Sequence, residues 1–330
     1  MKTAVVILNW NGKQLLERFL PSVIAYSSEA QIYVADNAST DDSISFLKTF
    51  YPEIKIIQNK ENGGFAKGYN DALKQVDADV FVLLNSDVEV TKNWLTPVIN
   101  HLKKHPKIVA AQPKILDYKN KNYFEYAGAA GGFIDKFGYP FCRGRIFNTM
   151  EEDKGQYNDI IPIFWASGAC FFVKSAAFWE AGGFDEDYFA HQEEIDLCWR
   201  FHNKNQKVSY VGTSSVYHLG GATLKNSNPK KTFLNFRNSL FSILKNAPRK
   251  QLFYLIFVRM LLDGFAAAQF LLSLQPLHFL AVGKAHFSFY ANLKKIYCKR
   301  MNNKQIDKYY NVYLLLYLYF FKDKKHFNSL

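Results

Sequence analysis

Four clusters of polar residues, each following a short apolar run, carry the side chains best suited to chemistry. They are Asn9-Trp10-Asn11-Gly12, Asp36-Asn37, Asn62-Gly63-Gly64 and Asn85-Ser86-Asp87. A carboxylate such as Asp36 can accept the imide N–H of uracil or thymine, and a site that pairs this polar edge discriminates well against other bases. The alternative role for Asp36 is to cap a following helix. The glycine pair permits close backbone approach, although glycine pairs also occur in ordinary turns.

Strands and helices alternate through the first third of the sequence and would bring these clusters together. Apolar runs over 4–8, 31–35, 54–58 and 80–84 predict strands, and a helical pattern follows each of the first three. This alternation favours right-handed crossovers and a mostly parallel sheet that binds ligands beyond the carboxyl ends of its strands. From about 108 to 217, short strands and glycine-bearing loops predict an α+β half, with one helix from about 193 to 204.

The order of these motifs resembles that of the family 2 glycosyltransferases, especially their bacterial rhamnosyltransferase-like branch. The resemblance covers roughly residues 3–240. It extends through Phe65-Ala66 with Gly68 and Asn70, Gly182-Gly183-Phe184-Asp185-Glu186, Glu193-Glu194-Ile195-Asp196, and His218 with Gly221. It implies the α/β GT-A fold, in which a Rossmann-like, mostly parallel sheet is flanked by helices and joined to an α+β acceptor half.

The resemblance implies a nucleoside-diphosphate sugar as donor, either dTDP- or UDP-linked, and a divalent ion. The residues expected around the donor are Leu8, Asn9, Asn11, Asp36, Asn37, Asn62, Gly64, Phe65, Gly68, Asn70, Asn85 and Ser86. Asp87 matches the acidic position that ligates the metal in the family, and His218 is implied as a second ligand of Mn²⁺ or Mg²⁺. Asn85 replaces the first Asp of the family motif, which leaves fewer protein charges at the ion. A solvated turn for Asp87 and a structural role for His218 are the alternatives.

Glu194 matches the family's catalytic base, which is an aspartate there, and Glu193 is the alternative base. Acidic residues at a helix start also interact favourably with the helix dipole, which alone would explain them. Trp165, Gly168 and His191 are expected on the acceptor side, although a core position suits Trp165 nearly as well. The arginine of Phe236-Arg237-Asn238 matches one that can reach the donor phosphate. The implied reaction is inverting transfer to a saccharide or lipid-linked saccharide in bacterial surface polysaccharide synthesis.

Charge is distributed unevenly along the 330 residues, of which 48% are hydrophobic, a content that excludes wholesale disorder. The net charge is +12, but residues 1–224 carry 23 Lys and Arg against 26 Asp and Glu, so residues 225–330 are strongly basic. Within them, 251–282 is rich in Leu, Phe and Ala and is interrupted by Arg259 and Asp263, which would pair on one helix face. A buried helical hairpin and a helix lying in the membrane interface are both consistent with this run. The basic charge favours monotopic attachment to an anionic membrane surface.

We therefore expect a GT-A domain over 1–240, with a nucleotide-sugar half (1–107) and an acceptor and catalytic-base half (108–240). A basic, aromatic-rich helical region (241–330) follows and is expected to associate with the membrane. Four cysteines without a C-x-x-C pair favour a reducing compartment, and the apolar run after Lys2 is short for a signal peptide. These features predict a cytoplasmic enzyme, peripheral or monotopic at the inner face of the cytoplasmic membrane.

Two other classes of protein are less consistent with the motifs. A sugar nucleotidyltransferase would carry a glycine-rich, basic phosphate loop directly after the first strand, where this chain has Asn9-Trp10-Asn11-Gly12. A non-catalytic protein that binds membranes or nucleic acid would explain the basic C-terminal third but not the acidic clusters at strand ends. Nucleic-acid binders rarely place carboxylates in the cleft, so we expect no nucleic-acid partner.

Overall fold

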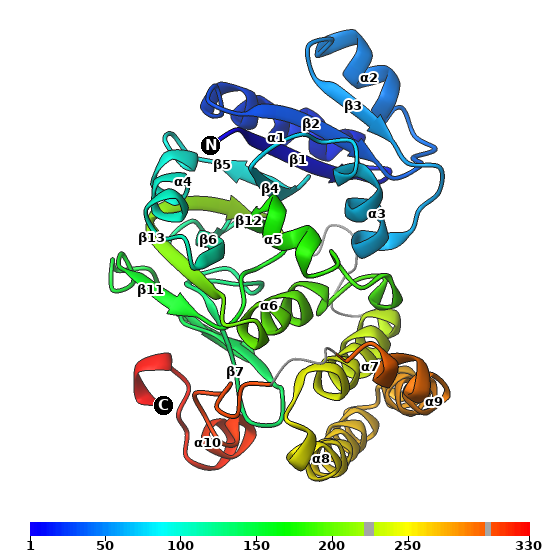
Figure 1. Cartoon of the computed structure of the whole chain (residues 1–330). Helices are drawn as coiled ribbons and strands as arrows, with labels where there is room; N and C mark the ends of the chain where they lie inside the picture. The colour runs from blue at the N-terminus through cyan, green and yellow to red at the C-terminus, as the bar shows by residue number, and fades with distance from the viewer. Residues whose placement is uncertain (221–227, 301–304) are drawn as a thin grey trace.

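One large sheet runs through the molecule (Figure 1), and three of its strands end at the polar residues Asn9, Asp36 and Asn85. The computed structural model describes residues 1–220, 228–300 and 305–330. Within these residues the sheet contains β1 (Thr3–Asn9), β2 (Gln31–Asp36), β3 (Lys55–Gln58), β4 (Val80–Asn85), β5 (Val88–Val90), β6 (Ile108–Asp117), β11 (Ile160–Ile163), β12 (Cys170–Lys174) and β13 (Lys207–His218). Their order is β11-β13-β6-β12-β4-β1-β2-β3, with β5 beside β13.

The first four strands are parallel, as the alternating pattern predicted. The helices α1 (Lys13–Tyr26), α2 (Ser43–Phe50) and α3 (Gly64–Leu73) connect them. Strand residues such as Val6, Val34 and Leu83 are fully buried, because helices cover this part of the sheet. The register sets Asn9 beside Asp36 and Leu8 beside Asn85, so three predicted polar clusters share one edge.

The second half of the sheet is mixed, consistent with the predicted α+β half. Strand β12 runs antiparallel to both β4 and β6, while β13 runs parallel to β6. Helices α4 (Leu95–Lys104), α5 (Ser175–Glu180) and α6 (Glu193–Asn203) belong to this half. A small antiparallel sheet is built from β7 (Gly132–Ile134), β8 (Pro140–Cys142), β9 (Arg145–Ile146) and β10 (Thr149–Met150).

A helical extension follows, as predicted, and packs at the end of the molecule opposite α2 (Figure 1). It contains α7 (Pro229–Asn246), α8 (Leu252–Leu272), α9 (Pro276–Cys298) and α10 (Leu315–Phe321). Helix α8 ends just before Pro276, which begins α9 because proline fits the first turn of a helix. Side chains of the extension, including Ile243, Leu255 and Leu315, belong to the same hydrophobic core as the sheet residues.

The polar face of α8 is turned toward the protein. Arg259 and Asp263 pair as predicted, with Arg259 Nε 2.7 Å from Asp263 Oδ1, and both are buried. Arg259 Nη1 also donates to the Phe137 carbonyl at 3.1 Å and to Ser239 Oγ at 2.7 Å, and the Tyr139 hydroxyl donates to Asp263 at 3.1 Å. These bonds attach α8 to α7 and to the loop after β7.

A buried carboxylate ties the C-terminal segment to the same loop. Asp135 accepts N–H bonds from Phe137 and Tyr139, each at 2.9 Å, and from Leu315 at 3.0 Å, and it forms a parallel bridge with Val312. Burial raises the pKa of Asp135 to about 6, although the three N–H groups oppose the shift. The segment around 312–315 is therefore an integral part of the core.

Candidate active site

The ends of β1 and β2 form a connected polar edge. Asn9 is fully buried, and its Nδ2 donates to Asp36 Oδ1 at 3.1 Å and to Ser39 Oγ at 3.3 Å. Asp36 Oδ2 accepts the Ser39 N–H at 2.9 Å, so Asp36 caps the turn after β2. The N–H of Ser43, at the start of α2, is bonded instead by Asp41, at 3.1 Å. Asn9 Oδ1 is buried without a hydrogen-bond partner, so the end of β1 carries one unsatisfied acceptor.

The neighbouring predicted donor residues lie at the same edge. Asn11 is exposed, and its Oδ1 accepts the Thr40 N–H at 2.7 Å, which fixes the loop after β2 to the loop after β1. Leu8, Asn85 and Ser86 are half-buried at the ends of β1 and β4. The structure therefore brings these parts of the predicted donor set together.

Asn37 holds the loop before α3 against the end of β2. Its Nδ2 donates to Asn62 Oδ1 at 2.9 Å and to the Gly64 carbonyl at 3.0 Å. Gly68 lies directly against Asn37, because a Cβ on Gly68 would be 3.0 Å from the Asn37 amide. Asn37 thus positions the start of α3 with both of its amide hydrogens.

The close backbone approach allowed by the glycine pair is to another loop of the protein. Gly64 has a φ of +76°, and a Cβ there would lie 2.4 Å from the Phe189 carbonyl oxygen. The same oxygen accepts the N–H groups of Phe65 at 2.7 Å and Ala66 at 3.2 Å. The first free N–H groups of α3 are therefore bonded by the loop that precedes the predicted catalytic base.

Asp87 and His218 meet, as the motif comparison predicted, and a third acidic residue joins them. His218 Nε2 is 3.1 Å from Asp87 Oδ1, and His218 Nδ1 is 3.2 Å from Glu125 Oε2. Burial lowers the pKa of His218, but attraction to Glu125 and Asp87 outweighs it and holds the pKa well above its usual range. The paired His218 in turn lowers the pKa of Asp87 against the effect of burial. Gly221 lies outside the described residues.

The pair Asp87 and His218 is chemically suited to a divalent ion. A carboxylate and a neutral imidazole are both ligands for such ions, so an ion here would replace the proton between His218 Nε2 and Asp87 Oδ1, which lie 3.1 Å apart. Glu125 contacts the opposite ring nitrogen, so one ion cannot bind all three side chains. The described part of the chain contains no group of three or more His, Cys, Asp or Glu side chains arranged to hold a metal. Further ligands would therefore come from donor phosphates and water, as is usual for Mg²⁺ sites.

The two predicted candidates for the base lie at the start of α6 and differ in exposure. Glu193 is buried, whereas Glu194 is half-buried. Burial raises the pKa of Glu194 to about 7, although backbone N–H groups, including that of Gly168, lower it. Burial and repulsion from Glu194 raise the pKa of Glu193 well above its usual range. One oxygen of each carboxylate is buried without a partner. Glu194 is thus the group better placed to exchange a proton with a ligand near neutral pH.

The three predicted acceptor-side residues occupy different environments. Gly168 lies beneath the site, where a Cβ would be 3.1 Å from the Phe65 ring. His191 lies just before the base; burial lowers its pKa to about 4, and its Nε2 is buried without a partner. Trp165 is buried, and its indole N–H donates to the Phe133 carbonyl at 2.9 Å. Trp165 therefore packs in the core, and its ring presents no face on which a sugar could stack.

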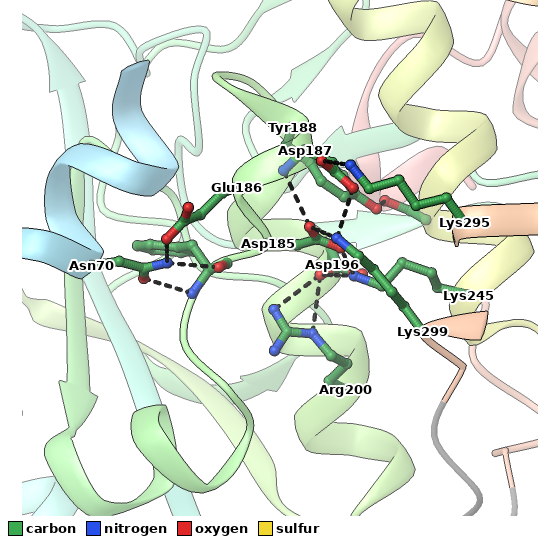
Figure 2. Close-up of polar contacts among 12 residues, drawn as sticks. Asn70, Asp185, Glu186, Asp187, Tyr188, Asp196, Arg200, Lys245, Lys295 and Lys299 are labelled. Atoms are coloured by element: carbon green, nitrogen blue, oxygen red, sulfur yellow. Dashed lines mark hydrogen bonds and ion pairs between the residues drawn. The ribbon is translucent and has the colours of Figure 1, made fainter. Parts of the chain in front are cut away.

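Asn70 also differs from its expected role at the donor. Its Nδ2 donates to the Phe184 carbonyl at 2.9 Å and to Glu186 Oε1 at 3.2 Å, and its Oδ1 accepts the Phe184 N–H at 3.0 Å (Figure 2). These bonds occupy both ends of the side-chain amide. Asn70 thus fixes the Gly182–Glu186 segment onto α3.

Arg237, matched to an arginine that can reach the donor phosphate, contacts the protein backbone instead. Its Nη2 donates to the carbonyls of Asp187 at 2.9 Å and Tyr188 at 3.2 Å. Two contacts at the site are not indicated by the motifs. Glu125 lies in an irregular loop after β6, and Asn238 bonds the loop before Glu194 from 47 to 50 residues away.

Comparison with known proteins agrees with the motif order. The sequence model described as Glycosyl transferase family 2 matches residues 4–182. The chain is 27% identical over 230 residues to the N-acetylglucosaminyl-diphospho-decaprenol L-rhamnosyltransferase of Mycobacterium tuberculosis, covering 65% of this chain and 75% of the relative.

Solved structures show the same GT-A fold at lower identity. The mannosyltransferase of Pyrobaculum calidifontis in complex with GDP-Man and Mn²⁺ has a TM-score of 0.55 and 14% identity, covering 90% of this chain and 83% of that chain. GalNAc-T7 with UDP, GalNAc and Mn²⁺ has a TM-score of 0.54 and 20% identity over 66% of this chain. The present chain spans 43% of GalNAc-T7.

Proposed function

Because the chain belongs to glycosyltransferase family 2, we propose that it transfers a sugar, with inversion, from a dTDP- or UDP-linked donor to a hydroxyl group. The acceptor is a saccharide or lipid-linked saccharide used in surface polysaccharide synthesis. The observation that carries this proposal is the half-buried Glu194, whose pKa is raised to about 7 by burial. The mycobacterial relative, named for rhamnosyl transfer onto a diphospho-decaprenol lipid, supports this class of donor and acceptor.

Glu194 acts as the general base in the proposed reaction. Its carboxylate takes the proton of the acceptor hydroxyl, and the oxygen attacks the anomeric carbon. The bond from that carbon to the diphosphate breaks on the opposite face, and the nucleoside diphosphate leaves with the bonding electrons. Because attack and departure occur in one displacement, no covalent enzyme intermediate forms. Asp36, at the end of β2, accepts the imide N–H of the uracil or thymine base.

Asp87 and His218 are the proposed protein ligands of Mn²⁺ or Mg²⁺. Such an ion would neutralise charge on the diphosphate as the nucleotide departs. Two other groups of the site do not depend on the ion. Asn37 and the Phe189 carbonyl hold α3 at the donor edge. Gly168 leaves room for the Phe65 ring beside Glu194, and its N–H contributes to the Glu194 environment.

Nucleotide binding should depend on Asp87. We expect UDP or dTDP with Mn²⁺ to raise the thermal midpoint of the wild type, because a ligand that binds only the folded state stabilises it. Replacement Asp87→Asn keeps the shape but removes the charge, and it should abolish the metal-dependent part of the shift. Glu89→Gln is the matched control, because Glu89 lies two residues away and pairs with Lys121. Equal shifts in wild type and Asp87→Asn would exclude Asp87 as a ligand.

We further propose that the C-terminal region holds the enzyme on an anionic membrane surface. Helix α8 turns Arg259 and Asp263 inward, and its outer face carries an apolar stripe of residues that are each more than half exposed: Phe253, Phe257, Leu261 and Phe265. Exposed aromatics on α10, Phe320 and Phe321, lie at the same end of the molecule (Figure 1). An apolar face within a strongly basic region is typical of interfacial helices.

One helix among the described residues, Arg249–Leu272, meets the length and composition of a membrane span. Crossing a bilayer would require α8 to leave the domain and to expose the Arg259–Asp263 pair, which is buried against Phe137, Tyr139 and Ser239. Breaking a buried ion pair from its partners costs several kcal/mol. Attachment along the outer face of α8 preserves all these contacts, so the monotopic arrangement is the one we propose.

Vesicle binding tests this surface. The double variant Phe257→Ser, Phe265→Ser should reduce pelleting with vesicles containing phosphatidylglycerol by about tenfold or more, since burying each Phe side chain is worth about 1.5–3 kcal/mol. The control is Phe50→Ser, which removes an equally exposed phenylalanine from α2 at the opposite end of the molecule. Unchanged pelleting of the double variant, or an equal loss in the control, would refute this surface.

A further inference from the structure

We infer that Asn238 is a positioning residue of the catalytic base: it fixes the strained loop 187–192, whose end begins helix α6 and whose middle caps helix α3. The inference rests on the proposed role of Glu194. It replaces the expectation that the Phe236-Arg237-Asn238 motif reaches the donor phosphate.

The loop before the base holds an unfavourable backbone conformation. Phe189, His191 and Gln192 have φ values of +63°, +68° and +74°, although none of them is glycine. Residues held in such conformations cost about 1–3 kcal/mol each and persist only where the surroundings enforce them. Three of them within four positions require strong external restraints, and the described structure supplies these from α7.

Asn238 is the centre of these restraints. It is fully buried on α7, and its Nδ2 lies within hydrogen-bond distance of three loop carbonyls: Tyr188 at 3.0 Å, Ala190 at 2.9 Å and His191 at 2.7 Å. Its Oδ1 accepts the Arg237 Nε–H at 2.9 Å, and Arg237 Nη2 bonds two more carbonyls of the same loop. The two hydrogens of the amide are shared among the three carbonyls. Because all three carbonyls reach the same nitrogen, the loop wraps around this one group.

The clamped loop sets the positions of both halves of the site. On one side, Gln192 immediately precedes Glu193, and its carbonyl accepts the Asp196 N–H at 2.9 Å in the first turn of α6. On the other side, the Phe189 carbonyl bonds the first N–H groups of α3 at the donor edge. A displacement near 1 Å at the reacting groups can cost about 10²-fold in rate. Asn238 therefore acts on the reaction through the loop, without contacting substrate.

The variant Asn238→Asp separates this role from simple packing. It keeps the size and shape of the side chain but removes the amide hydrogens and sets a carboxylate oxygen against three carbonyl oxygens. The first readout is release of nucleoside diphosphate from dTDP-rhamnose or UDP-N-acetylglucosamine with Mn²⁺ present. The second is hydrogen–deuterium exchange of the 185–194 backbone, and the third is the thermal shift produced by UDP or dTDP.

We expect turnover to fall by about 10²-fold, as for a base misplaced by roughly 1 Å, with faster exchange in 185–194 and a smaller nucleotide shift, because the same loop holds the start of α3. Arg237→Gln, at a half-buried position, should show the same pattern more weakly. It is the test variant to use if Asn238→Asp does not fold. Tyr139→Phe is the control for general destabilisation, because it removes a hydroxyl bond to Asp263 and leaves the bonds of Asn238 and Arg237 to the loop in place. It should lower the melting temperature and leave turnover unchanged.

Wild-type turnover in Asn238→Asp and Arg237→Gln, or a loss no larger than that of Tyr139→Phe, would overturn the inference. Unaltered exchange in 185–194 would also overturn it. If the wild type releases no nucleoside diphosphate from any donor and binds no nucleotide, the proposed function itself fails. That outcome is distinct, because the exchange experiment still reports whether Asn238 holds the loop.

Discussion

Glu194→Gln should lower turnover by about 10²-fold or more, within the usual contribution of a general base, while making the protein more stable at pH 8. The amide cannot take the acceptor proton, so transfer slows. It also carries no charge, so a costly buried carboxylate disappears. The pKa of Glu194 is raised to about 7 by burial. A residue that impairs stability and supports catalysis is expected at an active site.

The pH dependence has a defined sign. A raised folded-state pKa means that the native protein holds the Glu194 proton more tightly than the unfolded chain. The protonated Glu194 therefore makes its whole contribution to the free energy of unfolding below about pH 4.3, the usual pKa of glutamate. This contribution is lost as the pH rises through about 7. Above pH 7, the free energy of unfolding of Glu194→Gln should exceed that of the wild type by on the order of 3 kcal/mol. Wild-type turnover should rise with pH through about 7, as the base loses its proton.

Urea unfolding at pH 5 and pH 8 and a pH profile of turnover measure both effects. Glu193→Gln is the comparison, because Glu193 is the alternative base and lies one residue away. A larger loss of turnover in Glu193→Gln than in Glu194→Gln would transfer the role of base to Glu193. Retained turnover in both variants would remove this acidic pair from the mechanism.

Lys245→Met should lower the free energy of unfolding by about 3–5 kcal/mol, the cost of removing one partner from a buried ion-pair network. Lys245 Nζ lies 2.6 Å from Asp185 Oδ2 and 2.9 Å from Asp196 Oδ2, and it joins α7 to the segments on either side of the base (Figure 2). Burial raises the pKa values of both carboxylates, but attraction to Lys245, together with Lys299 at Asp185 and Arg200 at Asp196, lowers them overall. Without Lys245, the two buried negative charges lose their shared partner.

Lys295→Met provides the matched control, because it makes the same chemical change in the same network. Lys295 Nζ contacts Asp187 at 2.6 Å, but its side chain is 58% exposed, against 3% for Lys245. An exposed ion pair contributes about 0–1 kcal/mol. Urea denaturation of both variants, followed by circular dichroism, gives the comparison. Similar losses in the two variants would show that burial of Lys245 does not decide the strength of the network.

Much of the fold could be predicted because its signals are local. The apolar runs ending at Asn9, Asp36 and Asn85 are β strands, since buried parallel strands are continuously apolar. The acidic start at Glu193 and the pair Arg259–Asp263 are also local patterns, and both lie on helices as predicted. The antiparallel direction of β12 was not predictable in the same way, because strand direction depends on pairing with the distant β4 and β6.

The parts of the site that sequence patterns missed depend on long-range contacts. Glu125 meets His218 across 93 positions, and the bonds of Asn238 reach back about 50 residues. Glu125 lies in no motif, and the motif that contains Asn238 does not indicate this contact. The polar atoms of Asn70 and Arg237 bond the protein and not a donor, and Trp165 takes the core position that was its alternative. A motif records which residue type is needed, whereas the contact it makes depends on the folded neighbours.

The bond between Asp135 and the Leu315 N–H has a consequence for how the chain reaches its native state during synthesis. Residues near 315 leave the ribosome long after the catalytic half has been made, yet they complete the hydrogen bonding of a buried carboxylate within that half. Domains usually fold as units in the order in which they are synthesised. Here the earlier half lacks one of the three N–H bonds to Asp135 until the late residues are made, so chaperones are expected to meet it in an incomplete form.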